Sequence, residues 1–374
     1  MMREPDLLVV GASARAASFS ASRAGFYPAW IDQFADFDLQ RNFPGQKVNA
    51  SRYPQGIVDL ASSLHPMPFV YTGAMENHLD VLQQLQARHK LLGNSAQVCR
   101  AVRDPQLLTR CWEKAGIVHP QTLAAGSKAP PGNWLLKPLH GSGGQGIRSF
   151  NHETVLKGDA FYLQQYLNGE SRAGVFIGNG TACSLVGVTR QLVGESFLNA
   201  GKYSYCGSVG PLDIDQAEKE QWQAMGTALC QSFSLEGIFC VDAIKARGDI
   251  YPVEVNPRYS ASVEVLERAL DLPLLRFHRE ACEGEINFRL QAARNIMAKA
   301  YLFADNRLRS PREVSRIYED TGGSKESADI PMPGTLIETG HPVMTIFTAA
   351  VTVDAALEEL KTKAALYYGH FERL

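Results

Sequence analysis

The sequence predicts an α/β and α+β protein, in which a doubly wound α/β unit precedes two α+β subdomains and a small α+β extension. Three observations predict this class. Residues 7–32 alternate a buried-type strand, a tight turn, a helix of small residues and a second strand, as a parallel sheet requires. Residues 134–255 hold short strand-like segments, several separated by Gly/Asn turns, which is typical of an antiparallel sheet. The 374 residues, 45% of them hydrophobic, exceed what one small core accommodates.

The N-terminal unit begins with the apolar strand Leu7–Val10, the turn Gly11–Ser13 and a helix of small residues. Further elements continue the doubly wound pattern to about residue 93: strands at Ala29–Asp32 and Pro68–Thr72, and a helix at Asn77–Leu85. The segment after the first strand lacks the second and third glycines of a dinucleotide fingerprint. We therefore predict that this unit serves the fold and contacts substrate, with cofactor binding there as the lesser alternative.

The middle of the chain predicts helices followed by an antiparallel sheet. Asp104-Pro105 is a typical helix cap and first helical residue, and Ala115-Gly116 is a typical stop. Strand-like segments follow at Trp134–Lys137, Phe161–Tyr166, Ala173–Ile177, Cys183–Thr189 and Gln191–Phe197. We then expect a helix over Asp215–Ser234, a hairpin of Phe239–Ala246 and Ile250–Val255, and a helix beginning at Ser262–Ala269. The tail predicts strands at Lys299–Phe303, Thr335–Glu338 and Val343–Thr352 and a helix over Asp354–Tyr368.

Oxygen-bearing side chains recur on the predicted hairpin. Because strand side chains alternate with period two, Asp242 on one strand and Glu254 and Asn256 on the next are expected to share a face. Magnesium prefers hard oxygen ligands and completes its shell with water and phosphate oxygens, so two carboxylates and an amide suffice. We predict a magnesium site; solvated acids on an exposed strand face are the alternative.

A glycine-rich segment follows the strand that ends in Lys137. Residues without side chains let bare amides wrap phosphate oxygens, and the lysine adds a cation. The predicted phosphate-binding residues are Lys137, Gly141, Ser142, Gly143, Gly144 and Gly146, with His140 beside them. The segment is no Walker A motif, because Ile147-Arg148 stands where Lys-Ser/Thr would follow. An ordinary hairpin turn is the alternative.

The end of a later strand completes a possible nucleotide site. Gln164, Gln165, Tyr166 and Leu167 lead into Glu170, where backbone edges could face a purine and a carboxylate could face a ribose. Alone, this segment is simply the end of a strand. Its position between the glycine loop and the acidic hairpin favours the nucleotide site.

In order and spacing, these segments resemble the ATP-grasp superfamily. The resemblance implies a Rossmann-like pre-ATP-grasp domain over residues 1–95 and an ATP-grasp domain of two α+β subdomains over residues 96–295. The lid subdomain would span about 125–166 and the metal-binding subdomain about 167–295, with residues 296–374 as an extension outside the family core. It also implies that Gln164 meets the adenine amino group, Gln165 and Leu167 offer backbone contacts, and Glu170 contacts the ribose.

The activity implied by the resemblance is ATP-dependent carbon-nitrogen ligation. Asp242, Glu254 and Asn256 would hold two magnesium ions, for which manganese could substitute, and a carboxylate would become an acylphosphate that an amine captures. Arg258 and Arg172, with Lys137, are the candidates for holding the acceptor carboxylate or the migrating phosphoryl group. An ATP-dependent carboxylase acting through carboxyphosphate, or a catalytically silent nucleotide-binding regulatory module, are the alternatives.

Two departures from the family pattern narrow the expectation. Pro105 follows Asp104 where many relatives carry a nucleotide-binding lysine, so that contact is expected to be absent or supplied by Arg100 or Arg103. Cys240 stands where D-alanine ligases carry an arginine, which disfavours that activity. The sequence is similar to the amino-acid ligase branch that includes tyramine-glutamate ligase, which implies glutamate and an amine as substrates in one-carbon carrier cofactor (methylofuran-type) biosynthesis. The segment Lys202–Gly210 is then a candidate substrate loop, and a long hairpin connection is the alternative.

Composition limits the remaining partner classes. A net charge of -2 indicates no nucleic-acid partner, and the N-terminal apolar run is far too short for a signal or membrane segment. The seven cysteines form no CxxC pair, so neither a zinc cluster nor a disulfide framework is predicted. We expect a cytoplasmic enzyme acting on small molecules, and a homodimer as the commonest oligomer.

Overall fold

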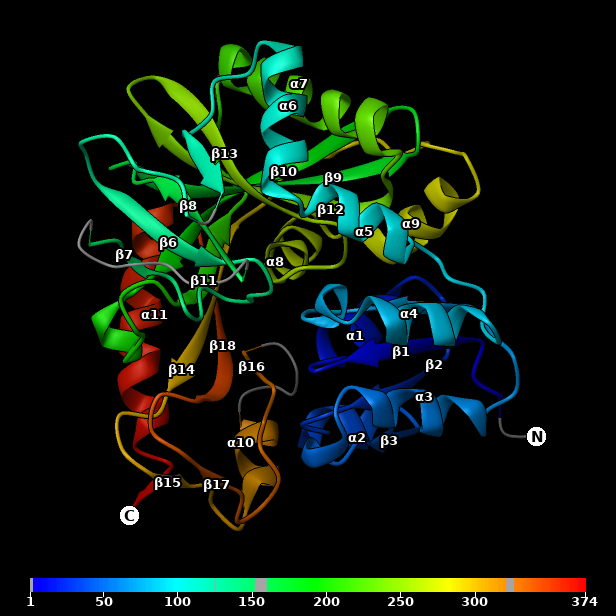
Figure 1. Cartoon of the computed structure of the whole chain (residues 1–374). Helices are drawn as coiled ribbons and strands as arrows, with labels where there is room; N and C mark the ends of the chain where they lie inside the picture. Colours follow the sequence, from blue (N-terminus) through cyan, green and yellow to red (C-terminus); the bar gives the residue numbers. More distant parts are fainter. Residues whose placement is uncertain (1–2, 125, 152–159, 321–325) are drawn as a thin grey trace.

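The computed structural model describes residues 3–124, 126–151, 160–320 and 326–374. The N-terminal unit is a parallel sheet of order β3-β2-β1-β4, seen in blue in Figure 1. Its strands are β1 (Leu7–Gly11), β2 (Pro28–Asp32), β3 (Gly45–Lys47) and β4 (Phe69–Tyr71). Its helical elements are α1 (Arg15–Arg23), α2 (Phe37–Asn42), η1 (Ala50–Arg52), α3 (Gln55–Ser62), η2 (Met75–Asn77) and α4 (Leu79–Gln86). The doubly wound α/β prediction is confirmed.

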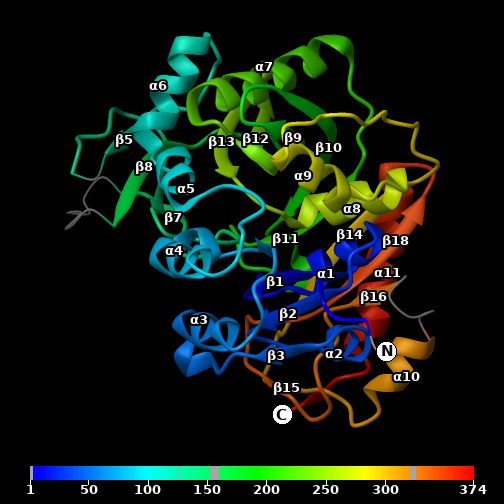
Figure 2. The same cartoon turned by 90° about the vertical axis from the view of Figure 1, so that its right-hand side faces the viewer.

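The two faces of this sheet are buried against different partners. Leu7 and Val9 of β1 pack with α1 and with the helices of the larger domain, whereas Leu8 and Val10 pack with α3 and α4. A strand buried on both faces reads as the continuous apolar run seen in the sequence. In Figure 2, the N-terminal unit lies against α8 (Ala261–Leu270) and α9 (Leu274–Cys282), which α1 contacts.

Helices α5 (Ala96–Val102) and α6 (Pro105–Ala115) connect the N-terminal unit to the rest. The Asp104 side chain accepts hydrogen bonds from the backbone N–H groups of Gln106 and Leu107 at 2.8 and 3.1 Å. Gly116 ends α6 with φ 67°, a conformation that glycine adopts without steric cost. The predicted cap and stop of α6 are therefore confirmed.

A separate small antiparallel sheet of order β5-β8-β6-β7, here called the lid sheet, lies mostly within the predicted lid subdomain. Its strands are β5 (Thr122–Ala124), β6 (Trp134–Pro138), β7 (Arg148–Ser149) and β8 (Phe161–Gln165). Trp134, Leu136 and Leu163 make up its small buried core. The central strands β6 and β8 place Lys137 directly opposite Tyr162.

The largest sheet has eight strands in the order β13-β12-β9-β10-β11-β14-β18-β16. Its first five are β13 (Asp249–Asn256), β12 (Glu236–Ala246), β9 (Glu170–Asn179), β10 (Cys183–Val193) and β11 (Tyr205–Gly210). Helix α7 (Gln216–Phe233) covers one face, and α8 and α9 cover the other. The two strands expected at Cys183–Thr189 and Gln191–Phe197 are one strand, because Arg190 stays paired with both β9 and β11; Ser196–Leu198 forms the short helix η3.

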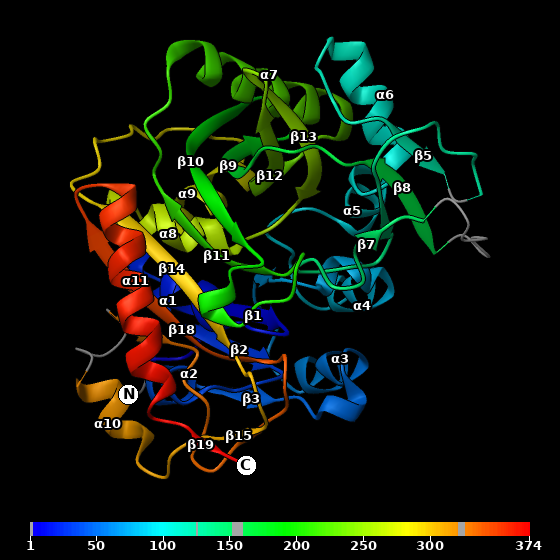
Figure 3. The same cartoon turned by 90° about the vertical axis from the view of Figure 1, so that its left-hand side faces the viewer.

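The same sheet continues through the C-terminal tail. Strands β14 (Ile296–Phe303), β18 (Pro342–Ala350) and β16 (Ser327–Ala328) extend it beyond β11, and Figure 3 shows α11 (Val353–Tyr368) lying along them. Helix α10 (Val314–Asp320) and a three-stranded sheet of β15 (Leu308–Arg309), β17 (Leu336–Ile337) and β19 (Glu372–Arg373) complete the tail. The tail is α+β as expected, but it is not separated from the preceding domain at residue 296. The same sheet continues there, because β11 pairs with β14.

A buried ion network joins the three parts of the molecule. Arg15 of α1 donates to both carboxylate oxygens of Glu264 at 2.8 and 3.0 Å, and its Nε lies 3.1 Å from Asp329. Lys299 of β14 donates to Glu264 at 2.7 Å. Burial would raise the pKa of Glu264, but Arg15, Lys299 and Arg268 outweigh it and hold that pKa well below its usual value.

Within the described ranges, no helix combines the length and apolar character needed to cross a membrane.

Candidate functional site

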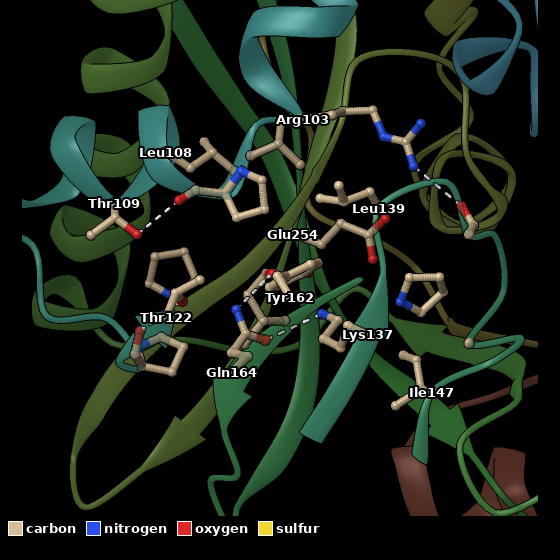
Figure 4. Close-up of a pocket in the computed structure, with 18 of the residues that line it drawn as sticks. Arg103, Leu108, Thr109, Thr122, Lys137, Leu139, Ile147, Tyr162, Gln164 and Glu254 are labelled. Carbon is tan, nitrogen blue, oxygen red and sulfur yellow. Dashed lines mark hydrogen bonds between the residues drawn. The ribbon is translucent and has the colours of Figure 1, made fainter. Parts of the chain in front are cut away.

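A cleft of about 740 Å³, open to solvent, lies between the lid sheet, α6 and the edge strand β13. Figure 4 shows its lining side chains converging from these elements. The glycine segment and the two central lid strands form one wall, and β13 forms the wall opposite. The lining residues are Arg103, Pro105, Leu108, Thr109, Trp112, His119, Pro120, Thr122, Lys137, Pro138, Leu139, Gly141, Ser142, Gly143, Gly144, Gln145, Ile147, Tyr162, Gln164, Pro252, Val253, Glu254 and Val255.

Lys137 lies deep in this cleft, with only 6% of its surface exposed. Its Nζ donates to Gln164 Oε1 at 3.2 Å, and Gln164 Nε2 donates to the carbonyl of Val253 at 3.3 Å. Burial would lower the pKa of Lys137, but Tyr162, Glu254 and Asp242 outweigh it and leave that pKa raised. The lysine therefore stays charged, and its Nζ donates to the neutral amide of Gln164. It can accept a further anionic partner.

The glycine segment turns sharply beside Lys137. Gly141, Ser142, Gly143 and Gly144 line the cleft, whereas Gly146 does not. Gly143 has φ 60° and Gly144 has φ 81°, both in the left-handed region. The Gly143 carbonyl accepts the Tyr205 N–H at 3.0 Å, and Ser149 Oγ lies 2.8 Å from the Tyr203 hydroxyl. The predicted phosphate loop therefore contacts the predicted substrate loop through these hydrogen bonds.

The three predicted metal ligands lie together at the hairpin of β12 and β13. Asp242 pairs directly with Glu254, and Asn256 Nδ2 donates to Asp242 Oδ2 at 3.0 Å. Gln191 Nε2 donates to the other Asp242 oxygen at 2.9 Å. Burial and then the Glu254 carboxylate raise the pKa of Asp242 to about 7. Burial and a neighbouring like charge both disfavour the ionised carboxylate.

The donor set fits magnesium only together with a phosphate-bearing ligand. Within the described ranges, no three His, Cys, Asp or Glu side chains converge as a metal site. Two carboxylates and an amide leave positions for water and phosphate oxygens, which magnesium commonly keeps. Asp242, Glu254 and Asn256 would hold the ion, and its charge would relieve the repulsion between the two acids.

Arg258 adjoins the acidic pair. Its Nη2 lies 2.6 Å from Glu76 Oε1 of η2 and 3.2 Å from Asn256 Oδ1. Burial would lower the pKa of Arg258, but Glu76 and other acids outweigh it and raise that pKa. The guanidinium thus remains charged at the boundary between the N-terminal unit and the strands that carry the predicted metal ligands.

Arg172 lies elsewhere, so the structure corrects its predicted place in the site. Arg172 contacts Glu170 at 2.6 Å and Glu218 of α7 at 2.5 Å. It precedes Ala173, the strand partner of Asp242, so strand alternation puts Arg172 on the α7 face and Asp242 on the opposite one. The sequence pattern alone did not reveal this register.

The predicted adenine and ribose segment is brought only partly to the cleft. Gln164 lines the cleft, but Gln165, Tyr166, Leu167 and Glu170 do not. The N–H groups of Gln165 and Tyr166 donate to the carbonyls of Gln121 and Asn133, so a nucleotide contact at Gln165 would use its carbonyl. Glu170 is paired with Arg172.

Several lining residues escaped the sequence reasoning. Leu108 and Trp112 present an apolar wall from α6, and their spacing of four residues is the signal that could have found them. Tyr162 follows from the pairing with Lys137, which only the sheet register reveals. Of the two arginines expected to replace the missing lysine, Arg103 lines the cleft and donates to the Gly141 carbonyl at 3.2 Å.

The N-terminal unit offers no free acid for a nucleotide ribose at the end of β2. Asp32 is fully buried, and its carboxylate accepts the backbone N–H groups of Ala14, Phe34 and Ala35. These bonds stabilise the turns after β1 and β2.

Comparison with known proteins agrees with this architecture. A family model described as an ATP-grasp domain matches residues 102–262. An uncharacterized protein of Methanocaldococcus jannaschii is 22% identical over 366 residues, covering 91% of this chain and 87% of its own length.

Two solved structures share the fold over almost the whole chain. Biotin carboxylase from Campylobacter jejuni superposes with a TM-score of 0.72 at 13% identity, covering 96% of this chain and 90% of its own. N5-carboxyaminoimidazole ribonucleotide synthetase from Thermotoga maritima has a TM-score of 0.67 at 15% identity, covering 99% of each chain. These likenesses show a shared mixed α/β fold over almost the whole chain.

Proposed function

We propose that this chain is an ATP- and magnesium-dependent carbon-nitrogen ligase, because an ATP-grasp family model matches residues 102–262. It joins a carboxylate, such as that of glutamate, to an amine through an acylphosphate and releases ADP and phosphate. One observation carries the proposal: Lys137, the glycine loop and Glu254 line one cleft. Asp242 lies opposite Glu254 in the sheet, and Arg258 donates to Asn256.

Each residue has a role in this proposal. Lys137 and Arg103 present positive charge to the nucleotide phosphates, and the glycine amides bind phosphate oxygens. Leu108 and Trp112 form an apolar wall against which a purine can pack, near Gln164. Bound magnesium supplies neutralisation of phosphate charge. Arg258 holds the reacting carboxylate or the phosphoryl group through charge-assisted hydrogen bonds.

The chemistry requires alignment and charge neutralisation more than a protein base. A carboxylate oxygen of the substrate bonds to the γ-phosphorus while the bond to the β-phosphate oxygen breaks, which releases ADP. The amine nitrogen then attacks the acyl carbon, phosphate leaves with the bonding electron pair, and the nitrogen gives up its proton. The loop contacts of Tyr203 and Tyr205 support closure over the acylphosphate, which would otherwise hydrolyse.

The finer substrate proposal concerns the amine. We propose glutamate as the activated carboxylate and tyrosine, tyramine or a growing cofactor as the amine, in the synthesis of a one-carbon carrier of the methylofuran type. The segment Lys202–Gly210 would recognise this amine. Its support is position, because Tyr203 and Tyr205 lie directly against the glycine loop.

ADP release from the full chain with ATP and magnesium tests the proposal. Glutamate is paired in turn with tyrosine, tyramine and other amines, and each substrate is also omitted. We expect ADP release and a new amide mass only with both substrates present. Asp242→Asn should abolish turnover, and Asp213→Asn at an exposed position is the matched control. Full activity of Asp242→Asn would contradict the site.

A second candidate is carboxylation through carboxyphosphate. The whole-chain likeness to biotin carboxylase and to N5-carboxyaminoimidazole ribonucleotide synthetase favours keeping it. The test uses bicarbonate-depleted buffer without any amino acid. ADP release that appears only when bicarbonate is added back would select this candidate. ATP binding without ADP release under every condition would instead indicate a catalytically silent regulatory module.

A further inference from the structure

The short helix η2 (Met75–Asn77) is where the N-terminal unit touches the proposed catalytic cleft. It connects β4 to α4, and two neighbouring side chains leave it toward different targets. Glu76 contacts Arg258, and Asn77 contacts the glycine loop and Arg103. One turn of backbone therefore reaches both the metal side and the phosphate side of the site.

The Glu76 contact continues as a chain of hydrogen bonds to the acidic pair. Glu76 is 3% exposed, and its Oε1 accepts from Arg258 Nη2 at 2.6 Å. Arg258 in turn donates to Asn256 Oδ1 at 3.2 Å. Burial would raise the pKa of Glu76, but the charge and hydrogen bond of Arg258 outweigh it and lower that pKa. Glu76 is thus a charged partner that fixes the guanidinium.

Within the described residues, Glu76 is the ion-pair partner of the Arg258 guanidinium. In the described part of the chain, neither Arg258 Nε nor Glu76 Oε2 has a hydrogen-bond partner. The remaining Arg258 contacts are to the Tyr259 carbonyl and Asn256, both uncharged and at 3.2 Å. Loss of the Glu76 charge would therefore release the arginine from its position.

The Asn77 contact acts on the glycine loop. Asn77 Nδ2 donates to the Gly141 carbonyl at 3.4 Å, and Arg103 Nη2 donates to the same carbonyl at 3.2 Å. Arg103 Nη1 also donates to Asn77 Oδ1, which closes a triangle of three groups. Gly141 is the first glycine of the loop, so this triangle anchors the point where the loop leaves Lys137 and its strand.

The backbone of the turn is itself well determined. Ala74, directly before it, has φ 72°, which an L residue adopts only at a steric cost. The N–H groups of Asn77 and His78 donate to the carbonyls of Ala74 and Met75 at 3.0 and 2.9 Å. The two side chains are thus held by a turn that leaves little freedom.

From these contacts we propose that the Met75–Asn77 turn positions both halves of the site, Glu76 by orienting Arg258 and Asn77 by anchoring the glycine loop. This inference rests on the proposed function, because it assigns those two residues as positioning residues of that site. It makes the N-terminal unit a working part of the ATP site. Removing the Glu76 contact should impair a different property of the site from removing the Asn77 contact.

Two variants with crossed readouts test the inference. ATP affinity is measured by calorimetric titration with magnesium, and turnover by ADP release with the substrate pair found active. Asn77→Ala loses the hydrogen bonds to Gly141 and Arg103, so it should raise the Kd for ATP about 2- to 10-fold and recover turnover at saturating ATP. Glu76→Gln should leave the Kd within about 2-fold and lower kcat about 10-fold or more, the effect of a lost charged partner.

Controls separate positioning from simple folding. Asp80→Asn lies at an exposed position of α4 close to the turn and should change neither readout. Glu76→Asp keeps the charge on a shorter side chain and should recover part of kcat, and it replaces Glu76→Gln if that variant fails to fold. Parallel changes of Kd and kcat in both variants, with equal losses of Tm, would overturn the inference in favour of a structural turn.

The outcomes also distinguish this inference from the proposed function. If the wild-type chain binds ATP but none of the tested substrates triggers ADP release, the ligase proposal is refuted. The Asn77 arm then still decides, because an unchanged ATP affinity in Asn77→Ala overturns the inference and a weakened affinity supports it. Wild-type chain that does not bind ATP refutes both.

Discussion

Gly144 lies directly against the carbonyl oxygen of Tyr203, and a Cβ at position 144 would stand 1.8 Å from that oxygen. A Cβ at the neighbouring Gly143 would meet no atom of the described residues within 4 Å. Both glycines have positive φ. The pair therefore separates the effect of a left-handed backbone from the effect of a close approach between two loops.

Gly144→Ala should displace the glycine loop from the Tyr203 segment and weaken ATP binding, whereas Gly143→Ala should have the smaller effect. The left-handed backbone costs either alanine about 1–2 kcal/mol, and only position 144 adds a backbone clash. Calorimetric titration with ATP and magnesium measures both variants. Equal affinities of the two would show that the loops separate freely in solution.

Lys137→Ala should weaken ATP binding by about 10-fold or more, because a buried cation that faces the phosphates is lost. Lys128→Ala, at an exposed position before the same strand, is the matched control and should bind ATP like the wild type. Nucleotide affinity unchanged in Lys137→Ala would count against the assignment of this cleft to ATP.

Glu254→Gln should raise the magnesium concentration needed for ATP binding, since one of the two carboxylates at the site becomes neutral. The measurement is ATP affinity across a magnesium titration, which needs no turnover. Wild-type chain treated with EDTA should show the same weakened binding. A Glu254→Gln variant with the wild-type magnesium dependence would remove Glu254 from the metal site.

Glu264→Gln should lower the free energy of unfolding by about 3–5 kcal/mol, the usual cost of removing one partner of a buried ion pair. Arg15 and Lys299 would then stay buried without their shared anion. Arg52→Ala, which breaks the exposed pair with Asp59, should cost at most about 1 kcal/mol. Urea unfolding monitored by circular dichroism compares the two, and equal losses would show that the buried network adds no stability.

His278 should make the fold less stable as pH falls from about 6.5 toward 4. Burial lowers its folded-state pKa to about 4, so the unfolded chain takes up the proton first over this window. Nδ1 accepts the Ile238 N–H at 2.8 Å, and protonation there would break that bond. The stability present above pH 6.5, about 3 kcal/mol, is lost through the window. Urea midpoints from pH 4 to 7 measure it, and His278→Gln should flatten this dependence.

Local signals predicted much of this fold. The helix cap at Asp104, the stop at Gly116 and the hairpin around Arg247-Gly248 depend on neighbouring residues alone. The placement of Asp242 opposite Glu254 did not follow from the turn and the period of two alone. The pairing that starts at Ala246 and Asp249 would continue to set Asp242 opposite Val253, and the bulge between Asp242 and Ala243 brings Glu254 there instead.

The pairing of strands far apart in the sequence could not be predicted in this way. Arg172 fell on the wrong face because its side depends on how β9 pairs with β12, about 70 residues away. The Glu76–Arg258 contact joins residues 182 positions apart, and no local pattern announces it. The break expected after Thr189 failed for the same reason, since pairing on both sides keeps Arg190 in one strand.

The unbroken sheet across residue 296 has a practical consequence for anyone handling this protein. A version ending at that point would lose β14, so β11 would become an unprotected edge of bare amides and carbonyls facing water. Such edges recruit other strands, and the shortened product should precipitate or self-associate rather than serve as a minimal enzyme.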